Sequence, residues 1–468
     1  MPPRQPPADP AAVRAQDAWH PAQAHSQLSR LVRVLRAWRG DNYAGDVFSA
    51  RCRPSLREEG EHVARVLGTA VPADDAAAPC AVETWFGWRL AELTGAPDGP
   101  PTAPGAPVTA RVGALLDALS PLAIDAAHVL AGRAALHGWA RAGRTSANGS
   151  CRLLAAADGW LAVNLSRPTD LDLLPALLEA EVDGDPWDAL ATAAAAAPAA
   201  TLAARAQLLG IPAAVPGSAT GIPPLRTHHL GGSAPVGGSF VVLDFSAMWA
   251  GPLCVHVLGR AGAQVVKVED VRRPDGARFG PPEFYAELHD GHASLVLDFS
   301  TPEGRAALAA LAADADVVVE SSRPRALRRL GLVAEEWLAA RPGRTWISIT
   351  GYGRDDPEQR VAFGDDAAVA GGLLATAPDG TPVFCGDAIA DPLTGLYAAA
   401  AALASRRTGG GHLLDVAMAG VCADLSRPGD APVVEHPRDA DGVLRHPGAT
   451  TPGGDPHDRA GDGWAAPC

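Results

Sequence analysis

The residues best suited to chemistry are aspartates in two short segments of the second half of the chain. One segment reads Phe384-Cys-Gly-Asp-Ala-Ile-Ala-Asp391-Pro-Leu-Thr-Gly395, and the other holds the pair Asp365-Asp366. A carboxylate can act as a nucleophile or transfer protons. Because Asp391 precedes proline at an expected helix start, it could equally be an ordinary N-cap. Asp387 could be a solvated turn residue, and a loop pair of aspartates is usually exposed.

Arginines gather after two of the expected strands. Their positions are Arg272, Arg273 and Arg278 after one strand, and Arg323, Arg325, Arg328 and Arg329 after another. In a doubly wound sheet, phosphates bind at the carboxyl ends of the strands, so these arginines could hold a nucleotide. Any single arginine is at least as often part of a solvated helix face, so the cluster is better support than any one member.

A strand–loop–helix–strand unit at Ser239–Glu269 is expected to position these side chains. Val241-Val242-Leu243 predicts a buried strand, Pro252 suits the first turn of a helix, and Gly262 suits its end. A second, parallel strand follows. The loop Ser-Ala-Met-Trp-Ala-Gly-Pro lacks the G-x-G-x-x-G pattern, which argues against a nicotinamide or flavin enzyme.

Strands and helices keep alternating beyond this unit. The expected strands are 294–299, 316–320 and 345–350, the expected helices are 300–313, 323–330, 334–340 and 391–405, and 412–418 is a strand or a helix start. Such alternation predicts an α/β fold with a doubly wound parallel sheet, which is Rossmann-like.

The first half predicts a second, smaller α+β domain. Helices are expected at 24–40, 58–67, 84–95, 112–141 with a break at Pro121, 171–179 and 187–209, and a hairpin at 151–165 turning at Asp158-Gly159. The predicted organisation is a disordered N-terminus (1–15), the helical and small α+β domain (16–212), a linker (213–237), the Rossmann-like domain (238–425) and a disordered tail (426–468).

Composition limits the classes of partner. The chain of 468 residues is 47% hydrophobic with a formal charge of −14, which argues against nucleic-acid and anionic-membrane binding. Seven scattered cysteines form no C-x-x-C pair, and no histidine pair has zinc spacing, so we expect no metal site. Without a signal sequence or a long apolar run, the chain is expected to be cytoplasmic.

The pattern D-F-S-x-x-x-A-G-P, followed by G-A-x-V-V-K-V-E, resembles the opening of the family III CoA-transferases, the CaiB/BaiF family. The resemblance runs in order from Val241 to about Leu425. It implies a CoA-binding Rossmann-like domain, transfer of CoA from an acyl-CoA to a small carboxylic acid, and a homodimer. In the first half, C-R-L-L-A-A-A-D-G-W-L-A-V-N-L looks like the hairpin of the family's small domain, which there follows the sheet. The chain is therefore permuted or consists of two fused copies. The segment T-W-F-G-W-R-L-A-E-L-T-G resembles the later D-D-A-A-V-A-G-G-L-L-A-T, which favours fused copies with a partial, degenerate first copy.

The resemblance assigns roles to single residues. It implies that Asp391 is the nucleophile, which forms a mixed anhydride and then an aspartyl-CoA thioester. It further implies that CoA is bound by Met248, Trp249 and Ala250 over the pantetheine arm, Arg272 and Arg273 near the adenine and 3′-phosphate, Arg323, Arg325 and Arg329 along the CoA site, and Tyr352 near the thioester. Trp249 could equally be core, and Tyr352 a packed aromatic residue.

Two departures from the family pattern leave alternatives open. The family's 2-methylacyl-CoA racemases use a G-H-D turn for proton transfer, whereas the matching turn here is Phe363-Gly-Asp365-Asp366, so a racemase-like isomerase is the second reading. The family's glycine-rich loop has no good equivalent, since Thr408-Gly-Gly-Gly-His412 joins a helix to the next element. The third interpretation is therefore a non-catalytic CoA-binding or scaffold protein.

Overall fold

The computed structural model describes residues 81–104, 108–235, 237–323 and 325–427, which fall within one compact unit of the chain. The helices expected at 24–40 and 58–67 lie outside the described residues. So does the N-terminus that is predicted to be disordered, and so does the predicted tail except for its first two residues.

A seven-stranded sheet forms the centre of the second half, in the order β4-β12-β9-β8-β5-β6-β7. Its strands are β4 (Leu225–His229), β5 (Phe240–Phe245), β6 (Ala263–Asp270), β7 (Ala293–Leu297), β8 (Val317–Glu320), β9 (Thr345–Thr350) and β12 (His412–Ala417). All neighbours pair in parallel except β4, which is antiparallel to β12. Ranked along the chain, the parallel strands run 3-2-1-4-5-6, the order of a doubly wound nucleotide-binding sheet.

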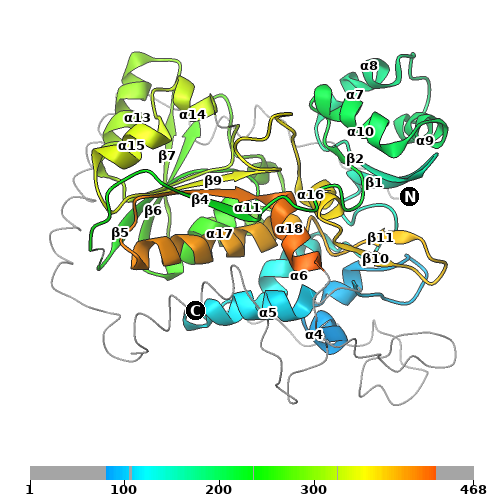
Figure 1. Ribbon diagram of the computed structural model, residues 1–468, viewed down its shortest axis with the longest axis horizontal. Helices are drawn as coiled ribbons and strands as arrows, with labels where there is room; N and C mark the ends of the chain where they lie inside the picture. Colours follow the sequence, from blue (N-terminus) through cyan, green and yellow to red (C-terminus); the bar gives the residue numbers. More distant parts are fainter. Residues whose placement is uncertain (1–80, 105–107, 236, 324, 428–468) are drawn as a thin grey trace. The chain divides into compact units, whose positions relative to one another are not determined.

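Helices cover both faces of this sheet (Figure 1). Successive residues of a strand point to opposite faces, so each face presents side chains on which helices pack. Val241 and Leu243 share a core with residues of the helices on one face, and Phe240 and Val242 share a core with those on the other. The helices on the first face include α13 (Pro302–Asp314) and α15 (Ala334–Ala340), and those on the second include α11 (Ala250–Arg260) and α17 (Ala390–Arg407). The predicted α/β fold with a large, mostly parallel sheet is confirmed.

The strand order reverses between β5 and β8. The loops that follow these two strands meet there, since the backbone N–H of Ala247 donates to Ser321 Oγ at 3.1 Å. Ligands of doubly wound sheets bind outside the carboxyl ends of the strands at such a reversal. This edge of the sheet is therefore the place to look for a site.

A three-stranded antiparallel sheet precedes the large one. It consists of β1 (Cys151–Ala156), β2 (Gly159–Asn164) and β3 (Ala213–Ala214), and the helices near it are α7 (Pro168–Asp172), α8 (Leu174–Leu178), α9 (Pro186–Ala196) and α10 (Ala199–Leu208). Apolar residues of these elements form a core of their own. The predicted hairpin is present, but its turn residues are Ala157 and Asp158, one position earlier than expected. The second domain stays a prediction, because the chain does not divide here.

The prediction that 213–237 is a linker is wrong where this segment forms strands. It contains β3, which pairs with β2, and β4, which pairs with β12 and forms one edge of the large sheet. The sequence of β4, Leu-Arg-Thr-His-His, shows no apolar run because its residues are exposed or only half-buried. An edge strand of this kind carries no burial pattern to detect.

A group of helices precedes the small sheet. They are α4 (Ala81–Gly87), η2 (Leu90–Leu93), α5 (Val108–Ala118), η3 (Ser120–Leu122) and α6 (Ala126–His137). Two of them, α5 and α6, pack against α17, and α5 also packs against α18 (Met418–Ser426). The single helix expected at 84–95 is broken at Arg89, whose φ is 61°. The expected break at Pro121 is confirmed, since that residue lies in η3 between two helices.

The other elements are short. They are η4 (Gly276–Phe279), α12 (Pro282–His289), α14 (Arg325–Arg329), α16 (Gly364–Ala370), β10 (Leu374–Thr376) and β11 (Pro382–Phe384). Within the described part of the chain, no helix has the length and hydropathy that crossing a bilayer requires. The four described cysteines are all free and buried.

Candidate functional site

Asp391 lies in the first turn of α17, where two helix N-termini meet. The helix begins at Ala390 with Ile389 at the N-cap position, so the simple N-cap reading of Asp391 does not hold. Its carboxylate also accepts a hydrogen bond from the backbone N–H of Ala250, at the start of α11. Since α11 follows β5, this carboxyl group lies at the carboxyl edge of the sheet. Partial positive charge from both helix ends favours an anion here.

A glycine makes room for this carboxylate. A Cβ on Gly364 would lie 2.3 Å from Asp391 Oδ2 and 2.3 Å from the carbonyl oxygen of Ala388. Ala388 itself has a φ of 42°, a left-handed conformation that is unfavourable for a residue with a Cβ. The turn that leads into α17 is thus strained and tightly packed against Gly364.

The pKa of Asp391 is raised to about 7. Burial is the largest cause, the carboxylates of Asp365 and Asp387 add to the rise in pKa, and Arg133 and the N–H of Ala250 oppose it. The residue nevertheless keeps some exposed surface. A carboxyl group with this pKa is present in both protonation states near neutral pH.

Asp387 is fully buried, so its reading as a solvated turn residue is wrong. The Arg133 guanidinium donates to both of its carboxylate oxygens, Nε to Oδ2 and Nη2 to Oδ1, each at 2.7 Å. Such paired, charge-assisted hydrogen bonds are the strongest that a carboxylate accepts from a side chain. They fix the turn that immediately precedes Asp391.

Asp365 and Asp366 are also buried at the start of α16, and the expectation that this pair is exposed is wrong. Asp365 accepts from the N–H of Ala388 at 2.8 Å and from Asn148 Nδ2 at 2.7 Å. Burial and the carboxylate of Asp387 raise the pKa of Asp365 to about 6.

Asp366 is held in a more enclosed position. Its Oδ1 accepts from Asn164 Nδ2 and from the N–H of Phe363, both at 3.0 Å. Its Oδ2 has no hydrogen-bond partner among the described residues. Burial raises its pKa to about 8 despite these bonds.

Asp365, Asp366, Asp387 and Asp391 together are called the acid cluster below. Its polar partners Arg133, Asn148 and Asn164 come from the first half of the chain, and sequence reasoning missed all three. Asn148 lies in Ser146-Ala-Asn-Gly-Ser150, a turn-forming sequence, which is a weak signal. Arg133 has no local signal, because nothing in Leu-Ala-Gly-Arg-Ala-Ala distinguishes a buried arginine from a solvated one.

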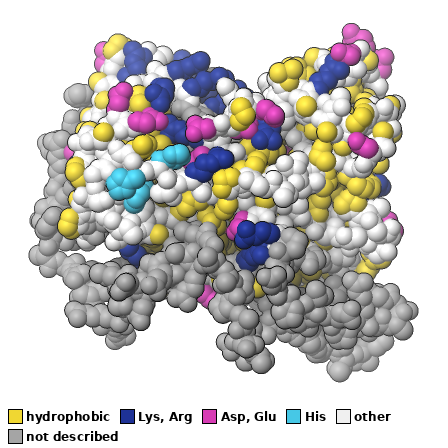
Figure 2. All heavy atoms as spheres, viewed as in Figure 1, with side chains coloured by type: hydrophobic (Ala, Val, Ile, Leu, Met, Phe, Trp, Pro, Cys, Tyr) yellow, Lys and Arg dark blue, Asp and Glu magenta, His cyan; other side chains and the backbone are white. Residues whose placement is uncertain are grey.

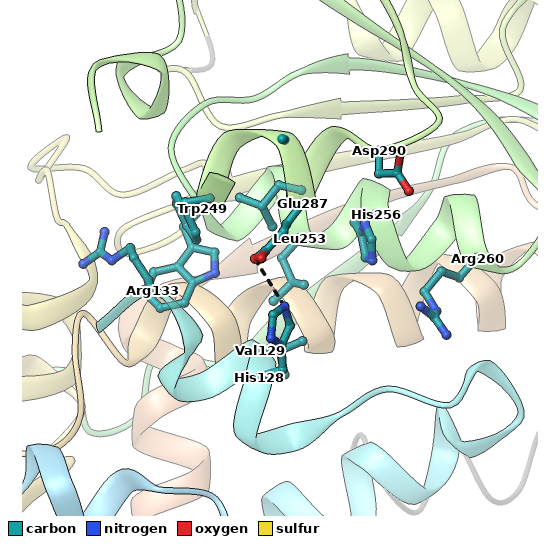
Figure 3. Close-up of a pocket in the computed structure, with 12 residues that line it drawn as sticks. His128, Val129, Arg133, Trp249, Leu253, His256, Arg260, Glu287 and Asp290 are labelled. Carbon is teal, nitrogen blue, oxygen red and sulfur yellow. Dashed lines mark ion pairs between the residues drawn. The ribbon is translucent and has the colours of Figure 1, made fainter. Parts of the chain in front are cut away.

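A cavity of about 440 Å³ lies between α6, α11 and α12 (Figure 3). Arg133 and Trp249 form part of its wall, and His128 Nε2 pairs with Glu287 Oε2 across it at 3.2 Å. Because the opposite side of the Arg133 guanidinium binds Asp387, this arginine separates the cavity from the acid cluster. Among the described residues, no group of His, Cys, Asp and Glu side chains is arranged to hold a metal ion.

Comparison with known sequences identifies a protein family that matches the segment containing Asp391. Residues 239–466 match the model of a protein family described as CoA-transferase family III. The chain contains a CoA-transferase family III region. The resemblance stated from sequence is therefore confirmed.

Known relatives match a part of the chain. A succinyl-CoA–D-citramalate CoA-transferase of Chloroflexus aurantiacus is 33% identical over 37% of this chain and 47% of the relative. A succinate–glutarate CoA-transferase of Agrobacterium fabrum is 34% identical over 38% and 49%, respectively. A solved CAIB/BAIF family protein from Brucella suis is 32% identical over 40% of this chain and 53% of that one, with a TM-score of 0.37. The chain thus spans about half the length of the curated relatives that it matches.

The residues expected to cover pantetheine are divided by burial. Met248 is 40% exposed with a φ of 72°, and its N–H donates to Asp275 Oδ1 at 2.8 Å. Trp249 and Ala250 are buried, and Trp249 packs edge-on against Phe284. Met248 is thus the one of the three that offers a substantial surface to a ligand.

The loop that carries Met248 rests on a buried ionic group, called the lysine network here. Its members are Lys267, Asp244, Asp275, Glu269 and Arg278. Lys267 Nζ lies 2.8 Å from Asp275 Oδ2 and 3.3 Å from Asp244 Oδ2. Although burial acts to raise the pKa of Asp275, its pairing with Lys267 and two backbone N–H groups lowers it overall.

The arginines expected to bind CoA are exposed and follow β6 or β8, the strands on either side of β5. Arg272 and Arg273 come after β6, and Arg272 pairs with Asp270 at 3.3 Å. Arg323, Arg325 and Arg329 come after β8. Figure 2 shows Lys and Arg side chains, mixed with acidic ones, gathered over the region where Figure 1 places α14.

Tyr352 and two further arginines are already engaged within the protein. Tyr352 is 3% exposed beneath the Arg360 guanidinium, which lies 4.1 Å from its ring centre, and burial raises the pKa of its phenol. Arg278 pairs with Glu269, and Arg328 pairs with Glu335. The packed-aromatic reading of Tyr352 thus fits its surroundings.

Proposed function

We propose that this protein transfers CoA from an acyl-CoA donor to a carboxylic acid, with Asp391 as the covalent nucleophile. The observation that carries the proposal is that Asp391 lies within the residues matched by the family model. The carboxyl group lies at the N-termini of α11 and α17, at the reversal edge of the sheet, and has a pKa of about 7. Relatives that are named as CoA-transferases support the same reaction type.

The reaction begins with attack of an Asp391 carboxylate oxygen on the thioester carbonyl. The C–S bond breaks, which leaves a mixed anhydride and releases CoA thiolate. The thiolate then attacks the aspartyl carbonyl, breaks the anhydride, and gives an aspartyl-CoA thioester and the free donor acid. The acceptor carboxylate attacks this thioester and the same two steps run in reverse, which restores the Asp391 carboxylate.

Backbone donors suit the charge that develops in these steps. Each attack creates a negatively charged tetrahedral oxygen next to Asp391, where the N-termini of α11 and α17 offer N–H groups and partial positive charge. The raised pKa of Asp391 reflects a carboxylate that is poorly solvated, and a poorly solvated carboxylate is the more reactive nucleophile.

CoA is proposed to lie along the same edge. Met248 would cover the pantetheine arm, since it is the exposed residue of its loop. Arg323, Arg325 and Arg329 on one side, with Arg272 and Arg273 on the other, would bind the phosphates. The related enzymes are named for dicarboxylic acids such as glutarate and malate, so succinyl-CoA with glutarate is the first pair to test.

Trapping the covalent intermediate tests the proposal. The protein is incubated with succinyl-CoA alone, and its intact mass is measured before and after borohydride, which reduces an aspartyl thioester. We expect a CoA adduct on the native chain and none on Asp391→Asn. Asp379→Asn, an exposed turn aspartate, is the matched control and should retain the adduct. A folded native protein that gives no adduct and no transfer with any acyl-CoA tried would contradict the proposal.

The second candidate is proton exchange at the α-carbon of an acyl-CoA. It is favoured by Asp365, which occupies the position of the racemases' histidine and has a pKa raised to about 6 beside Asp391. Deuterium incorporation into the acyl group without a covalent adduct would support this reaction over transfer. Failure of both assays, with CoA still bound, would leave the non-catalytic reading.

The assembly is part of the same proposal. We propose that the protein is a homodimer. We also propose that residues 16–212 derive from a partial first copy of the family. Light scattering on the purified full chain measures the first, since a monomer mass at assay concentration would contradict it.

A further inference from the structure

Arg133 is held between two parts of the site that are far apart in sequence. Its guanidinium binds both oxygens of Asp387 on one side and lies 4.5 Å from the Trp249 ring centre on the other. Trp249 belongs to the loop after β5, and Asp387 belongs to the turn before α17. Figure 3 shows the arginine beside Trp249 at the cavity wall. One side chain thus connects the ligand-facing loop with the turn that carries the nucleophile.

The charged groups around Asp391 come from several elements. Arg133 faces it from α6, Asp365 from α16 with Asp366 behind it, Asp387 from the preceding turn, and the Cys422 thiol from α18. From α11 it receives the backbone N–H of Ala250. Among these groups, Arg133 is the one cation facing several carboxyl groups.

We propose that Arg133 is a positioning residue of the transfer reaction, which fixes the Asp387 turn against Trp249 and places its positive charge beside the acid cluster. The kinetic part rests on the proposed function, whereas the electrostatic part does not. The arginine precedes the residues matched by the family model, so the first half of the chain supplies this element of the site.

The geometry of the turn explains why its anchor matters. Asp387 is fully buried, and Ala388 is held in a left-handed conformation by an N–H bond to Asp365. Without Arg133, the Asp387 carboxylate would be buried without its ionic partner, which is unfavourable enough to reshape the turn or to make Asp387 take up a proton. Either change alters the position or the charge of Asp391, three to four residues further on.

Direct titration of Asp391 tests the electrostatic part without any substrate. Carboxyl ¹³C NMR on aspartate-labelled protein follows the signal that disappears in Asp391→Asn. In Arg133→Gln, the pKa of Asp391 should rise by about 1–3 units, because the nearest opposite charge is lost. The double variant Arg133→Gln/Asp387→Asn loses one charge of each sign, so its Asp391 pKa should return toward the native value.

Kinetics test the positioning part. The midpoint of the kcat/KM–pH profile should move in Arg133→Gln by the same amount as the NMR pKa. Arg133→Lys keeps the charge but not the two-point contact, so it should leave the midpoint in place and lower kcat by about tenfold or more. Arg260→Gln, which changes another arginine of the cavity wall, should change neither.

The outcomes separate the two proposals. An unchanged Asp391 pKa in folded Arg133→Gln overturns the inference. If Arg133→Gln does not fold, native kcat in Arg133→Lys overturns it instead. A shifted pKa in a protein that transfers no CoA supports the role of Arg133 and counts against the proposed function.

Discussion

Two buried ionic groups lie along the same edge of the sheet, and their charge balance differs. In the lysine network, Lys267 and Arg278 face the carboxylates of Asp244, Asp275 and Glu269. In the acid cluster of four aspartates, Arg133 faces three, namely Asp365, Asp387 and Asp391. The pKa values of Asp275 and Glu269 are lowered, whereas those of Asp365, Asp366 and Asp391 are raised.

The difference distinguishes a group that supports a loop from a group whose carboxyl groups titrate near neutral pH. In the lysine network, the nearly matched charges stabilise the ionised forms of Asp275 and Glu269, which hold a loop but have little reactivity. In a group with too few cations, carboxyl groups stay near their titration points and are poorly stabilised, as acid–base or nucleophilic chemistry requires. A shortage of cations around buried acids is therefore the feature that marks the site here.

The largest expected effect is on the nucleophile itself. Asp391→Asn should lower CoA transfer by on the order of 10³-fold or more, because an amide cannot form the anhydride. The free energy of unfolding should not fall, since the change removes a poorly solvated carboxylate. Steady-state transfer assays and urea denaturation measure the two effects. Substantial transfer by the variant would mean that the acid cluster does not carry out the reaction.

The lysine network should respond in stability instead. Lys267→Met leaves Asp244 and Asp275 buried without their cation, so unfolding should become easier by about 3–5 kcal/mol. Urea denaturation measures this change. Arg272→Met, which breaks an exposed pair, should leave the denaturation midpoint almost unchanged. Equal effects of the two variants would contradict the supporting role of the network.

Gly364→Ala should disturb the geometry of the acid cluster with little change in charge. The added Cβ meets Asp391 Oδ2 and the Ala388 carbonyl, so a displacement on the order of 1 Å should lower kcat about 100-fold. Gly113→Ala, in α5 with open space around the new methyl group, is the matched control and should retain full activity. Native kcat in Gly364→Ala would show that the turn adapts freely.

The cation shortage also predicts how stability varies with pH. The folded pKa values of Asp365, Asp366 and Asp391, at about 6, 8 and 7, lie above the unfolded value near 4. The folded chain therefore binds more protons than the unfolded chain between about pH 4 and pH 8, and the contribution of these groups to stability falls as pH rises through that window.

Asp366→Asn should remove part of this dependence. At pH 8 the variant should be more stable than the native chain by on the order of 1 kcal/mol, with a smaller difference at pH 5. Urea denaturation at the two pH values gives the comparison. A variant that is less stable at pH 8 would mean that the Asp366 carboxylate has a cationic partner after all.

The smallest effect is expected at the exposed arginines. Arg329→Ala should raise KM for the acyl-CoA by up to about 10-fold and leave kcat unchanged, because a solvated cation adds affinity but not reactivity. The effect should shrink at high salt. A fall in kcat at saturating acyl-CoA would mean that Arg329 contributes to the reaction itself and not only to the binding of CoA.

The sequence predicted the large sheet well because its strands are buried on both faces. The apolar run Val241-Val242-Leu243 and the strand at 345–350 are examples, and the latter is observed as β9 with the same bounds. The family resemblance also selected Asp391, which the structure places in the first turn of α17. The exposed β4 was missed because its side chains follow no burial pattern.

The partners of the acid cluster could not be predicted from the sequence. Arg133, Asn148 and Asn164 reach the acid cluster from segments more than 200 residues away. Local patterns record which face of an element is apolar, not which distant polar group meets it. The same limit explains why Asp365, Asp366 and Asp387 read as exposed, although tertiary packing buries all three.

The edge strand β4 has a consequence for the order in which the chain folds during translation. Leu225–His229 is synthesised before every parallel strand, whereas its neighbour β12 is the last strand of the sheet to be made. A nascent chain must therefore hold an unpaired edge until His412–Ala417 has left the ribosome. A second nascent chain could offer its own β12 in that interval, so strand exchange between copies is the misassembly to which this topology is most open.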